Sequence, residues 1–360
     1  MIAFFAATPF QVFNCINIKL SSFQSVDADI YILSYAGDNK GLLEICKNSE
    51  LFKNVYYLSE PFNGHGRIRF LKSYLFPNRE LVTILKSKRY EQIFSTRIGP
   101  AAEFYYTFLR KQNKEVAFNY YEECVGDYFL EIAHRQSALV KLIKLFGYKN
   151  PFDSFGKLWL YRPELLFANN GYPNERIPTV EKGSQLCNKI QQAFKLGEIT
   201  LPIDCKLIYL DQPFKRQQNI DINNIAVLDV ISKVIAKENI FVKMYPLDRD
   251  SSYENAGNNV LTEIYCPWEV LFGAYDFSDI ILVAINSTAV VTPFTVYGVE
   301  QKAVRLYNYF DISLINFESQ KKYFNACMSS YSDKGRITTP CDDASLIHAL
   351  EQMQRNEETR

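Results

Sequence analysis

The sequence predicts an α/β protein of two Rossmann-like, doubly wound domains that face each other across a cleft. The chain has 360 residues, which is longer than one hydrophobic core usually serves. Short apolar runs alternate with longer segments of helical spacing, as in a parallel sheet wrapped by helices. This alternation stops in a stretch rich in Gly, Pro and Asn at residues 146–170 and then resumes. We therefore expect an N-terminal domain at residues 1–165, a linker at 166–200 and a C-terminal domain at 201–360.

Strands and helices are expected to alternate in both halves. In the first half, apolar runs predict strands at 2–7, 28–33, 54–58, 92–95 and 115–119. Helical spacing between and after them covers 11–20, 41–48, 68–86, 100–112 and 127–145. In the second half, strands are expected at 206–210, 240–244, 259–263, 280–285 and 303–306. The expected helices are a connecting one at 179–196 and then 223–237, 267–275, 288–297 and 343–355, the last without an assignable role.

Composition and charge exclude several classes of protein. A hydrophobic fraction of 48% with 22% charged residues is that of a folded globular chain, and a formal net charge of zero gives no argument for nucleic acid as a partner. Eight cysteines are scattered without a close pair, which argues against a zinc site and against a disulfide framework. The apolar residues 2–16 lack a basic start and are interrupted by Thr8-Pro9, a poor fit to a signal peptide or a membrane-spanning helix. We expect a cytoplasmic protein that needs no metal.

Ligands of open α/β sheets gather at the carboxyl ends of the strands, so the residues after each strand are the candidates for a site. The first such place is Thr8-Pro9-Phe10-Gln11, after the first strand. Thr8 can cap the following helix or face a ligand, and Gln11 is a polar side chain in an apolar first turn. An ordinary N-cap followed by proline explains Thr8 equally simply.

The second place is the acidic loop that follows the fifth strand, with Glu122, Glu123 and Gly126. Transfer of a group to a hydroxyl needs a carboxylate that accepts the proton, and two adjacent acids in a cleft keep one pKa high enough for a base. The alternative is a solvated loop, because most charged side chains are exposed.

Two further places lie in the second half. Lys243, Tyr245, Pro246 and Arg249 follow a convincing strand, and the two cations suit a phosphate or a sugar carboxylate. A turn with a surface ion pair is the alternative for that segment. After the strand at 280–285, the residues Asn286, Ser287 and Thr288 place hydroxyl donors at an expected helix start, which favours a phosphate site, although N-capping alone also explains the serine.

In this order, the four places resemble glycosyltransferase family 52, the bacterial lipooligosaccharide and capsule sialyltransferases of GT-B type. The family's acidic pair followed by glycine matches Glu122-Glu123, with the glycine displaced to Gly126. Its small-hydroxyl motif matches Ser287-Thr288, whereas Tyr245-Pro246 stands where the family has His-Pro. A tyrosine hydroxyl can donate a hydrogen bond to a phosphate but does not bring the positive charge of imidazolium.

The resemblance implies an inverting glycosyltransferase that transfers sialic acid or a related nonulosonic acid from its CMP conjugate. The acceptor would be a hydroxyl of a bacterial surface glycan in capsule, lipooligosaccharide or O-antigen, and no cofactor is implied beyond the CMP-sugar co-substrate. Glu123, or else Glu122, would be the base. Asn286, Ser287, Thr288, Lys243 and Tyr245-Pro246 would hold the donor phosphate, with Arg249, Thr8, Gln11 and Gly126 in the same site. Two alternatives remain open: a GT-B transferase with a UDP-hexose donor, and a non-catalytic glycan- or nucleotide-binding protein.

A basic aromatic segment bears on the partners. Residues 135–150 hold Lys141, Lys144 and Lys149 among apolar and aromatic side chains without an acid, a composition that suits an anionic membrane surface. A lipid-linked acceptor and a peripheral contact with the inner membrane would follow. The alternative is an amphipathic helix packed on its own domain. A homodimer is left open.

Overall fold

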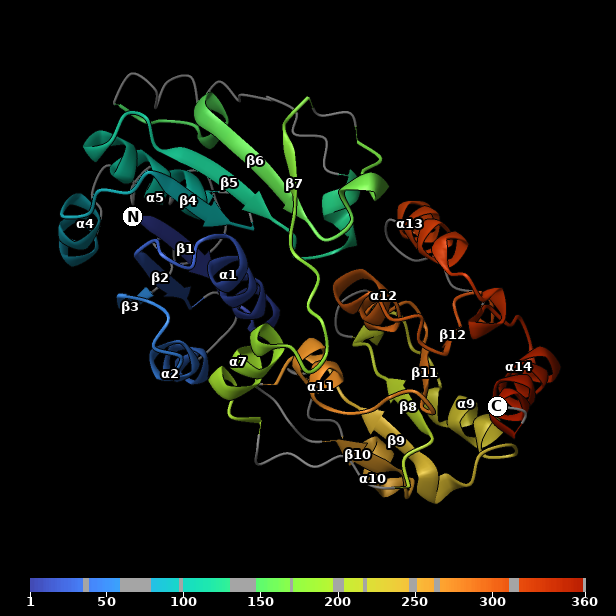
Figure 1. Ribbon diagram of the computed structural model, residues 1–360. Coiled ribbons are helices and arrows are strands. Elements are labelled where there is room, and N and C mark those ends of the chain that lie inside the picture. Colours follow the sequence, from blue (N-terminus) through green and yellow to red (C-terminus); the bar gives the residue numbers. More distant parts are fainter. Residues whose placement is uncertain are drawn as a thin grey trace. The chain divides into compact units, whose positions relative to one another are not determined.

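The computed structural model describes residues 1–34, 39–58, 79–96, 100–129, 147–168, 171–196, 204–215, 219–245, 251–261, 266–310 and 317–358. The chain divides into two compact units, each of which is considered by itself (Figure 1). Unit 1 comprises Met1–Pro178 with Gln192–Phe194, and unit 2 comprises Thr179–Gln191 with Lys195–Arg360. The main change from one unit to the other falls at Pro178, inside the segment that the sequence predicts as a linker.

Unit 1 contains a fully parallel sheet of seven strands in the order β3-β2-β1-β4-β5-β6-β7. The order reverses between β1 and β4, which is the switch point of a Rossmann-like fold. The strands are β1 (Ile2–Ala6), β2 (Ala28–Leu33), β3 (Asn54–Leu58), β4 (Gln92–Ser95), β5 (Ala117–Tyr121), β6 (Phe155–Leu160) and β7 (Asn174–Arg176).

Helices cover both faces of this sheet, with α1 (Pro9–Ser22) and α2 (Lys40–Asn48) on one face and α4 (Arg79–Lys86) and α5 (Pro100–Gln112) on the other (Figure 1). Side chains of β1 alternate between the two cores, as a strand requires. Phe5 packs in the cluster that contains Phe104 and Leu109 of α5. Phe4 instead stacks on Phe94, whose ring also meets Phe23 at the end of α1.

Strands β6 and β7 differ from the sequence prediction, which treats residues 146–170 as irregular and 166–200 as a linker. β6 contains Gly156, and a Cβ there would meet Asn119 Oδ1 at 2.6 Å. The same Asn119 oxygen accepts a hydrogen bond from the Lys157 N–H at 2.9 Å, at the register shift between β5 and β6. A glycine inside a strand therefore marks the close approach of a neighbouring side chain here, not a loop.

Unit 2 has a second fully parallel sheet with the order β10-β9-β8-β11-β12-β13. This is the Rossmann strand order again, with its reversal between β8 and β11. The strands are β8 (Leu207–Leu210), β9 (Ile240–Lys243), β10 (Asn259–Leu261), β11 (Ile281–Ala284), β12 (Ala303–Arg305) and β13 (Ile337–Thr338). The prediction of an α/β protein of two Rossmann-like domains is confirmed at this level.

Helices α9 (Asn224–Ile231) and α14 (Asp343–Glu358) pack together over one face of this sheet, and α11 (Trp268–Ala274) and α12 (Thr292–Tyr297) lie on the other (Figure 1). Leu346, Leu350 and Met353 of α14 belong to the same buried cluster as Val283. The final helix, to which the sequence assigns no role, thus completes the core of unit 2. The described residues also form α7 (Gln185–Ala193), α10 (Ser252–Asn255) and α13 (Phe317–Ser330), of which the sequence predicts only the first.

Candidate functional site

The carboxyl end of β1 brings together two side chains that the sequence singles out. Thr8 caps α1, and its hydroxyl oxygen accepts the Gln11 backbone N–H at 3.3 Å. Its geometry is thus that of the ordinary N-cap followed by proline. Gln11 Oε1 accepts the N–H of Ala7 at 2.6 Å, which fixes the direction of its amide. Gln11 Nε2 then donates to Glu123 Oε1 at 2.6 Å, so the start of α1 holds the acidic loop after β5.

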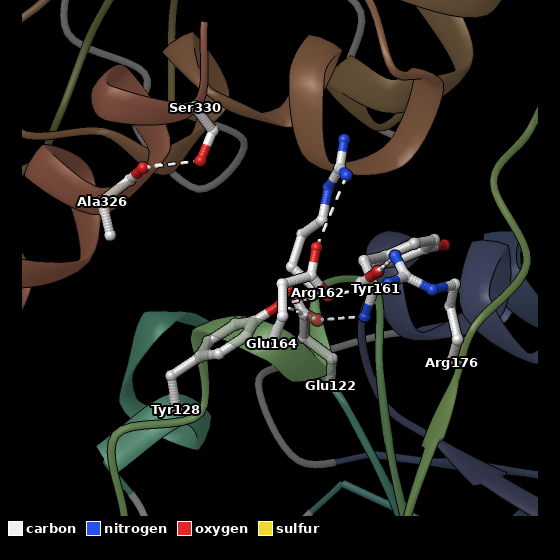
Figure 2. A network of polar contacts seen from close by, with 8 residues as sticks. All are labelled: Glu122, Tyr128, Tyr161, Arg162, Glu164, Arg176, Ala326 and Ser330. Atoms are coloured by element: carbon white, nitrogen blue, oxygen red, sulfur yellow. Dashed lines mark hydrogen bonds and ion pairs between the residues drawn. The ribbon is translucent and has the colours of Figure 1, made fainter.

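Glu122, the neighbour of Glu123, is only 6% exposed and is enclosed by hydrogen bonds (Figure 2). Its Oε2 accepts the Tyr128 hydroxyl at 2.6 Å and the Tyr161 N–H at 2.8 Å. Burial raises the pKa of Glu122 to about 8; the two hydrogen bonds oppose this shift, and the charge of Asp127 adds to it. Burial, not the adjacent Glu123, is therefore the main reason for the high pKa that the sequence analysis expects in this pair.

Asp127 organises the acidic loop from η1 (Val125–Phe129), a short 3-10 helix. Its Oδ2 accepts the N–H groups of Glu123 at 2.6 Å and Cys124 at 2.9 Å, while Oδ1 accepts the Tyr120 hydroxyl at 2.6 Å. Burial raises its pKa to about 6 against these hydrogen bonds. The sequence analysis does not assign a role to this aspartate. By contrast Gly126 is exposed, and a Cβ there would lie at an ordinary 3.4 Å from Cys124 Sγ.

A buried polar stripe on α1 supports the same region. Asn14 Nδ2 donates to the Glu122 carbonyl at 2.8 Å, and Asn14 Oδ1 accepts the Tyr161 hydroxyl at 2.7 Å. Asn17 donates to the same hydroxyl at 3.3 Å and to the Pro178 carbonyl at 2.9 Å. With Gln11, these residues recur every three positions and so share one face of the helix.

Charged side chains border the enclosed glutamate where β6 and β7 end (Figure 2). Arg176 donates to the Tyr161 carbonyl at 2.9 Å and to Glu164 Oε2 at 2.8 Å. Arg162 lies 3.6 Å from Glu164 Oε1, and its N–H donates to the Tyr128 hydroxyl at 3.2 Å. The loop after β6 is thereby tied to the loop after β5.

In unit 2, Lys243 ends β9 and is buried. It lies in the electrostatic environment of Glu269, a buried residue of α11 whose pKa is raised to about 7 by burial, while the Thr292 hydroxyl and the charge of Lys243 act in the opposite direction. Tyr245 follows the strand and is half-buried. The expected contacts of Pro246 and Arg249 lie outside the described residues, as do the residues 130–146 of the basic aromatic segment.

Asn286 is held at three points at the switch point of unit 2. Its N–H donates to Gln212 Oε1 at 2.6 Å, across from the end of β8, and its Nδ2 donates to Gln320 of α13. Its Oδ1 accepts from Arg305 Nη2 at 2.8 Å. The half-buried Ser287 and Thr288 follow.

The helix expected at 288–297 is split, because a 3-10 turn, η6 (Thr288–Val290), precedes the short α12. Ser287 Oγ accepts the Ala289 N–H at 3.3 Å and so caps this turn. The hydroxyls of Ser287 and Thr288 therefore stand beside a 3-10 turn and do not open a long helix. The long helix that the sequence predicts from residue 288 is therefore wrong, whereas the binding of a phosphate by these hydroxyls stays a prediction.

Arg305 is the residue of this region that sequence analysis misses. Its side chain is 0% exposed, and its guanidinium lies 3.4 Å from the centroid of the Phe324 ring and 4.3 Å from that of Tyr307. Burial lowers its pKa to about 9, so it remains a cation at neutral pH. Each cation–π contact contributes about 0.5–2 kcal/mol, whereas burying an ion costs several kcal/mol. Together the two aromatic contacts offset about 1–4 kcal/mol of that cost.

Within the described ranges there is no cluster of three or more His, Cys, Asp or Glu side chains arranged to hold a metal ion. No helix in the described part of the chain combines the length and apolarity needed to span a bilayer. Six of the eight cysteines are buried thiols, and Cys124 and Cys341 are exposed.

No family model and no curated protein matches the sequence. Solved structures resemble the chain over nearly its whole length. A putative UDP-N-acetylglucosamine 2-epimerase from Listeria monocytogenes covers 99% of this chain and 88% of its own at 9% identity, with a TM-score of 0.55. The UDP-GlcNAc 2-epimerase from Neisseria meningitidis, bound to UDP-GlcNAc, covers 99% and 92% at 11% identity, with a TM-score of 0.54. Arabidopsis thaliana UGT89C1, complexed with UDP-L-rhamnose, covers 99% and 90% at 11% identity, with a TM-score of 0.51.

At these identities the likeness concerns the fold. It agrees with the two Rossmann-ordered sheets and gives the chain a GT-B-type architecture. The resemblance to glycosyltransferase family 52 finds no support in these comparisons beyond that architecture.

Proposed function

We propose that this chain is an inverting glycosyltransferase that uses a nucleotide-sugar donor, with the acceptor base in unit 1 and the donor site in unit 2. The observation that carries the proposal is the hydrogen bond from Gln11 to Glu123. It holds a half-buried carboxylate at the carboxyl edge of the unit 1 sheet, where ligands of this fold bind.

Glu123 suits the role of base better than Glu122. Both hydrogen bonds to Glu122 converge on one carboxylate oxygen of a buried side chain, which makes it a structural acceptor of this loop. Glu123 is more exposed, and its backbone is positioned by Asp127. In a single displacement, Glu123 takes the proton of the acceptor hydroxyl while the oxygen attacks the anomeric carbon. The bond to the nucleotide phosphate breaks, and its electron pair leaves with that phosphate.

For the donor, a UDP-hexose is better supported than a CMP-nonulosonic acid. Two of the solved structures that share this fold contain UDP-sugars. The half-buried Tyr245 stands where the sialyltransferase family has the histidine that assists departure of CMP, and it brings no positive charge to the phosphate. Lys243 supplies a cation at the end of the same strand.

Donor transfer by the full-length protein tests the proposed base. Glu123→Gln should lower the rate by at least about 10²-fold, the usual contribution of a general base. Glu115→Gln, on an exposed residue before β5, is the matched control and should keep the rate. Full activity in both Glu123→Gln and Glu122→Gln would contradict the assignment of a base to this pair.

Thermal unfolding with UDP or CMP decides the donor. A nucleotide at 100 times its dissociation constant stabilises the folded chain by about 2.7 kcal/mol. When UDP and CMP are added at the same concentration, the one that binds more tightly therefore gives the larger shift in melting temperature. A larger shift with CMP would favour the sialyltransferase alternative. Nucleotide binding without any consumption of UDP- or CMP-sugars would instead indicate a non-catalytic binding protein.

A further inference from the structure

Arg305 is a buried cation at the carboxyl edge of the unit 2 sheet. It is the last residue of β12 and pairs in register with Ala284, the last residue of β11. Its Nη2 donates to Asn286 Oδ1, while its Nε and Nη1 have no acceptor within the described part of the chain. Two nitrogens of a fully buried guanidinium, which together carry three N–H donors, thus have no acceptor.

The surroundings of Arg305 are neutral. No carboxylate of the described residues pairs with it: the rings of Tyr307 and Phe324 cover its guanidinium, and the groups that act on its charge are Tyr307 and Cys327. Asn286, its one hydrogen-bond acceptor, is uncharged and is held in place by Gln212 and Gln320. Buried charges in folded proteins are usually paired with an opposite charge. Arg305 has no such partner among the described residues, so we expect a bound anion to supply the negative charge.

We propose that Arg305 is the internal counter-charge of an anion site, which it forms with Asn286 and the hydroxyls of Ser287 and Thr288. Its ligand is a phosphate group, and on the proposed function, on which this identification rests, that phosphate belongs to the nucleotide of the donor. Inorganic phosphate or pyrophosphate shares the same chemistry. Because the guanidinium is closed to solvent, binding moves one of its aromatic covers, of which Phe324 on α13 is the nearer.

Isothermal titration of the full chain with UDP, CMP, uridine and cytidine tests the inference. The phosphate-bearing ligand should bind more tightly than its uncharged nucleoside. Arg305→Met, which keeps the bulk and removes the charge, should cut that advantage by about 10- to 100-fold, the size expected for one charge-assisted hydrogen-bonded contact. Binding of the nucleoside should stay unchanged. An undiminished advantage in Arg305→Met would overturn the proposal.

Asn286→Asp is a second variant, which tests the inference even if the Arg305→Met protein does not fold. The new carboxylate lies where Oδ1 accepts from Arg305 and supplies a permanent counter-charge, and the Gln320 amide can rotate to donate to it. This variant should raise the melting temperature of the ligand-free chain and weaken nucleotide binding by about 10-fold or more. A less stable chain with unaltered nucleotide affinity would refute the anion site.

Pyrophosphate separates this inference from the proposed function. If the natural chain binds no nucleotide but is stabilised by pyrophosphate, and Arg305→Met and Asn286→Asp abolish that stabilisation, the anion site stands and the glycosyltransferase proposal fails. If nucleotides bind equally well to the natural chain and to both variants, the anion site fails and the donor site lies elsewhere.

Discussion

Glu122 and Glu123 are adjacent in sequence, yet their surroundings give them different chemistry. Glu122 is enclosed by Tyr128 and the backbone of Tyr161, and burial raises its pKa to about 8. Glu123 is half-buried and accepts from Gln11, a side chain fixed by the start of α1. A carboxyl group that is protonated near neutral pH stabilises the loop, while its half-buried neighbour is the group that we propose as the base.

The pKa of Glu122 leads to a prediction about stability. The folded protein binds this proton more tightly than the unfolded chain does, whose pKa is near 4.5. The contribution of Glu122 is therefore most favourable below about pH 4.5, and it is lost as the pH rises to about 8. Glu122→Gln, which stays neutral, should raise the free energy of unfolding at pH 8 by up to about 4 kcal/mol, because each tenfold change in proton affinity corresponds to about 1.4 kcal/mol.

Urea denaturation of the natural chain and of Glu122→Gln between pH 5 and pH 9 measures this effect. The difference between the two should be small at pH 5 and grow with pH. A constant difference over the whole range would mean that Glu122 is ionised in the folded protein at pH 5 and that its burial is compensated by other charges.

Asp127 gives a second prediction at this scale. Its Oδ2 accepts two backbone N–H groups of the acidic loop, so Asp127→Asn can keep its amide oxygen on those groups only by turning its amide nitrogen toward the Tyr120 hydroxyl. We expect a loss of about 1–3 kcal/mol in the free energy of unfolding, because the buried Tyr120 hydroxyl loses its acceptor, and a lower transfer rate, because a neutral amide oxygen holds the Glu123 backbone less firmly than a carboxylate does. Tyr120→Phe, which removes only the donor to Oδ1, is the matched control and should lose less in both measurements.

At the scale of elements, α1 connects the strand ends of unit 1. Its buried polar side chains reach the loops after β5 and β6, through Asn14 to Glu122 and through Asn17 to Tyr161. A helix whose buried face is apolar could slide against its sheet, whereas paired buried amides fix both its rotation and its height. The site on the acidic loop therefore depends on a helix that is more than a hundred residues earlier in the chain.

Asn14→Leu tests this dependence. The change leaves the Glu122 carbonyl without the Asn14 donor and the Tyr161 hydroxyl without its acceptor, and each buried group left in this way costs about 1–3 kcal/mol. Tyr161→Phe in the same background should recover part of the loss, because the orphaned hydroxyl is gone. A double-mutant cycle by chemical denaturation measures the coupling, and strict additivity of the two changes would refute a shared network.

The elements that the sequence predicts well are those with a strong local pattern. The strands at 28–33, 54–58 and 92–95 and the helix at 100–112 have the predicted bounds, because each is a clear apolar run or a helical repeat. β6 is not predicted because its Gly156 resembles a loop glycine. The glycine is needed there because the Asn119 side chain of the neighbouring strand lies against it, and such a contact leaves no local sequence pattern. Likewise α13 has a weak pattern of its own.

The residues of the candidate site likewise fall into those that the sequence predicts and those that it does not. The rule that polar residues after strands form the site leads from sequence alone to Gln11 and Glu123, which lie in contact. Asn14, Asp127 and Arg305 are missed, because a buried Asn, Asp or Arg looks like any other polar residue until its partners are known. For Arg305 a signal exists, since it lies inside the strand that the sequence predicts at 303–306, between Val304 and Leu306.

At the scale of the whole molecule, the chain uses one strand order twice, with different charged groups at the two carboxyl edges. In unit 1 the loop after β5 carries Glu123 and Asp127, with two arginines bordering it at the ends of β6 and β7. In unit 2 the corresponding edge carries Lys243 and Arg305 as the last residues of their strands. A hydroxyl acceptor needs a carboxylate and a phosphate leaving group needs cations, so this separation favours an acceptor site in unit 1 and a donor site in unit 2.

Hydrogen exchange can test that division, because each unit has its own sheet and its own core. Saturating UDP should slow exchange of amides at the carboxyl edge of unit 2, in residues 284–291 and 305–310, because the bound phosphate orders these segments. The strands β2 and β3 of unit 1 should exchange at the same rate with and without UDP. Arg305→Met should lose most of the protection. Protection confined to the loop around Glu123 would place the nucleotide in unit 1 and reverse the assignment of donor and acceptor.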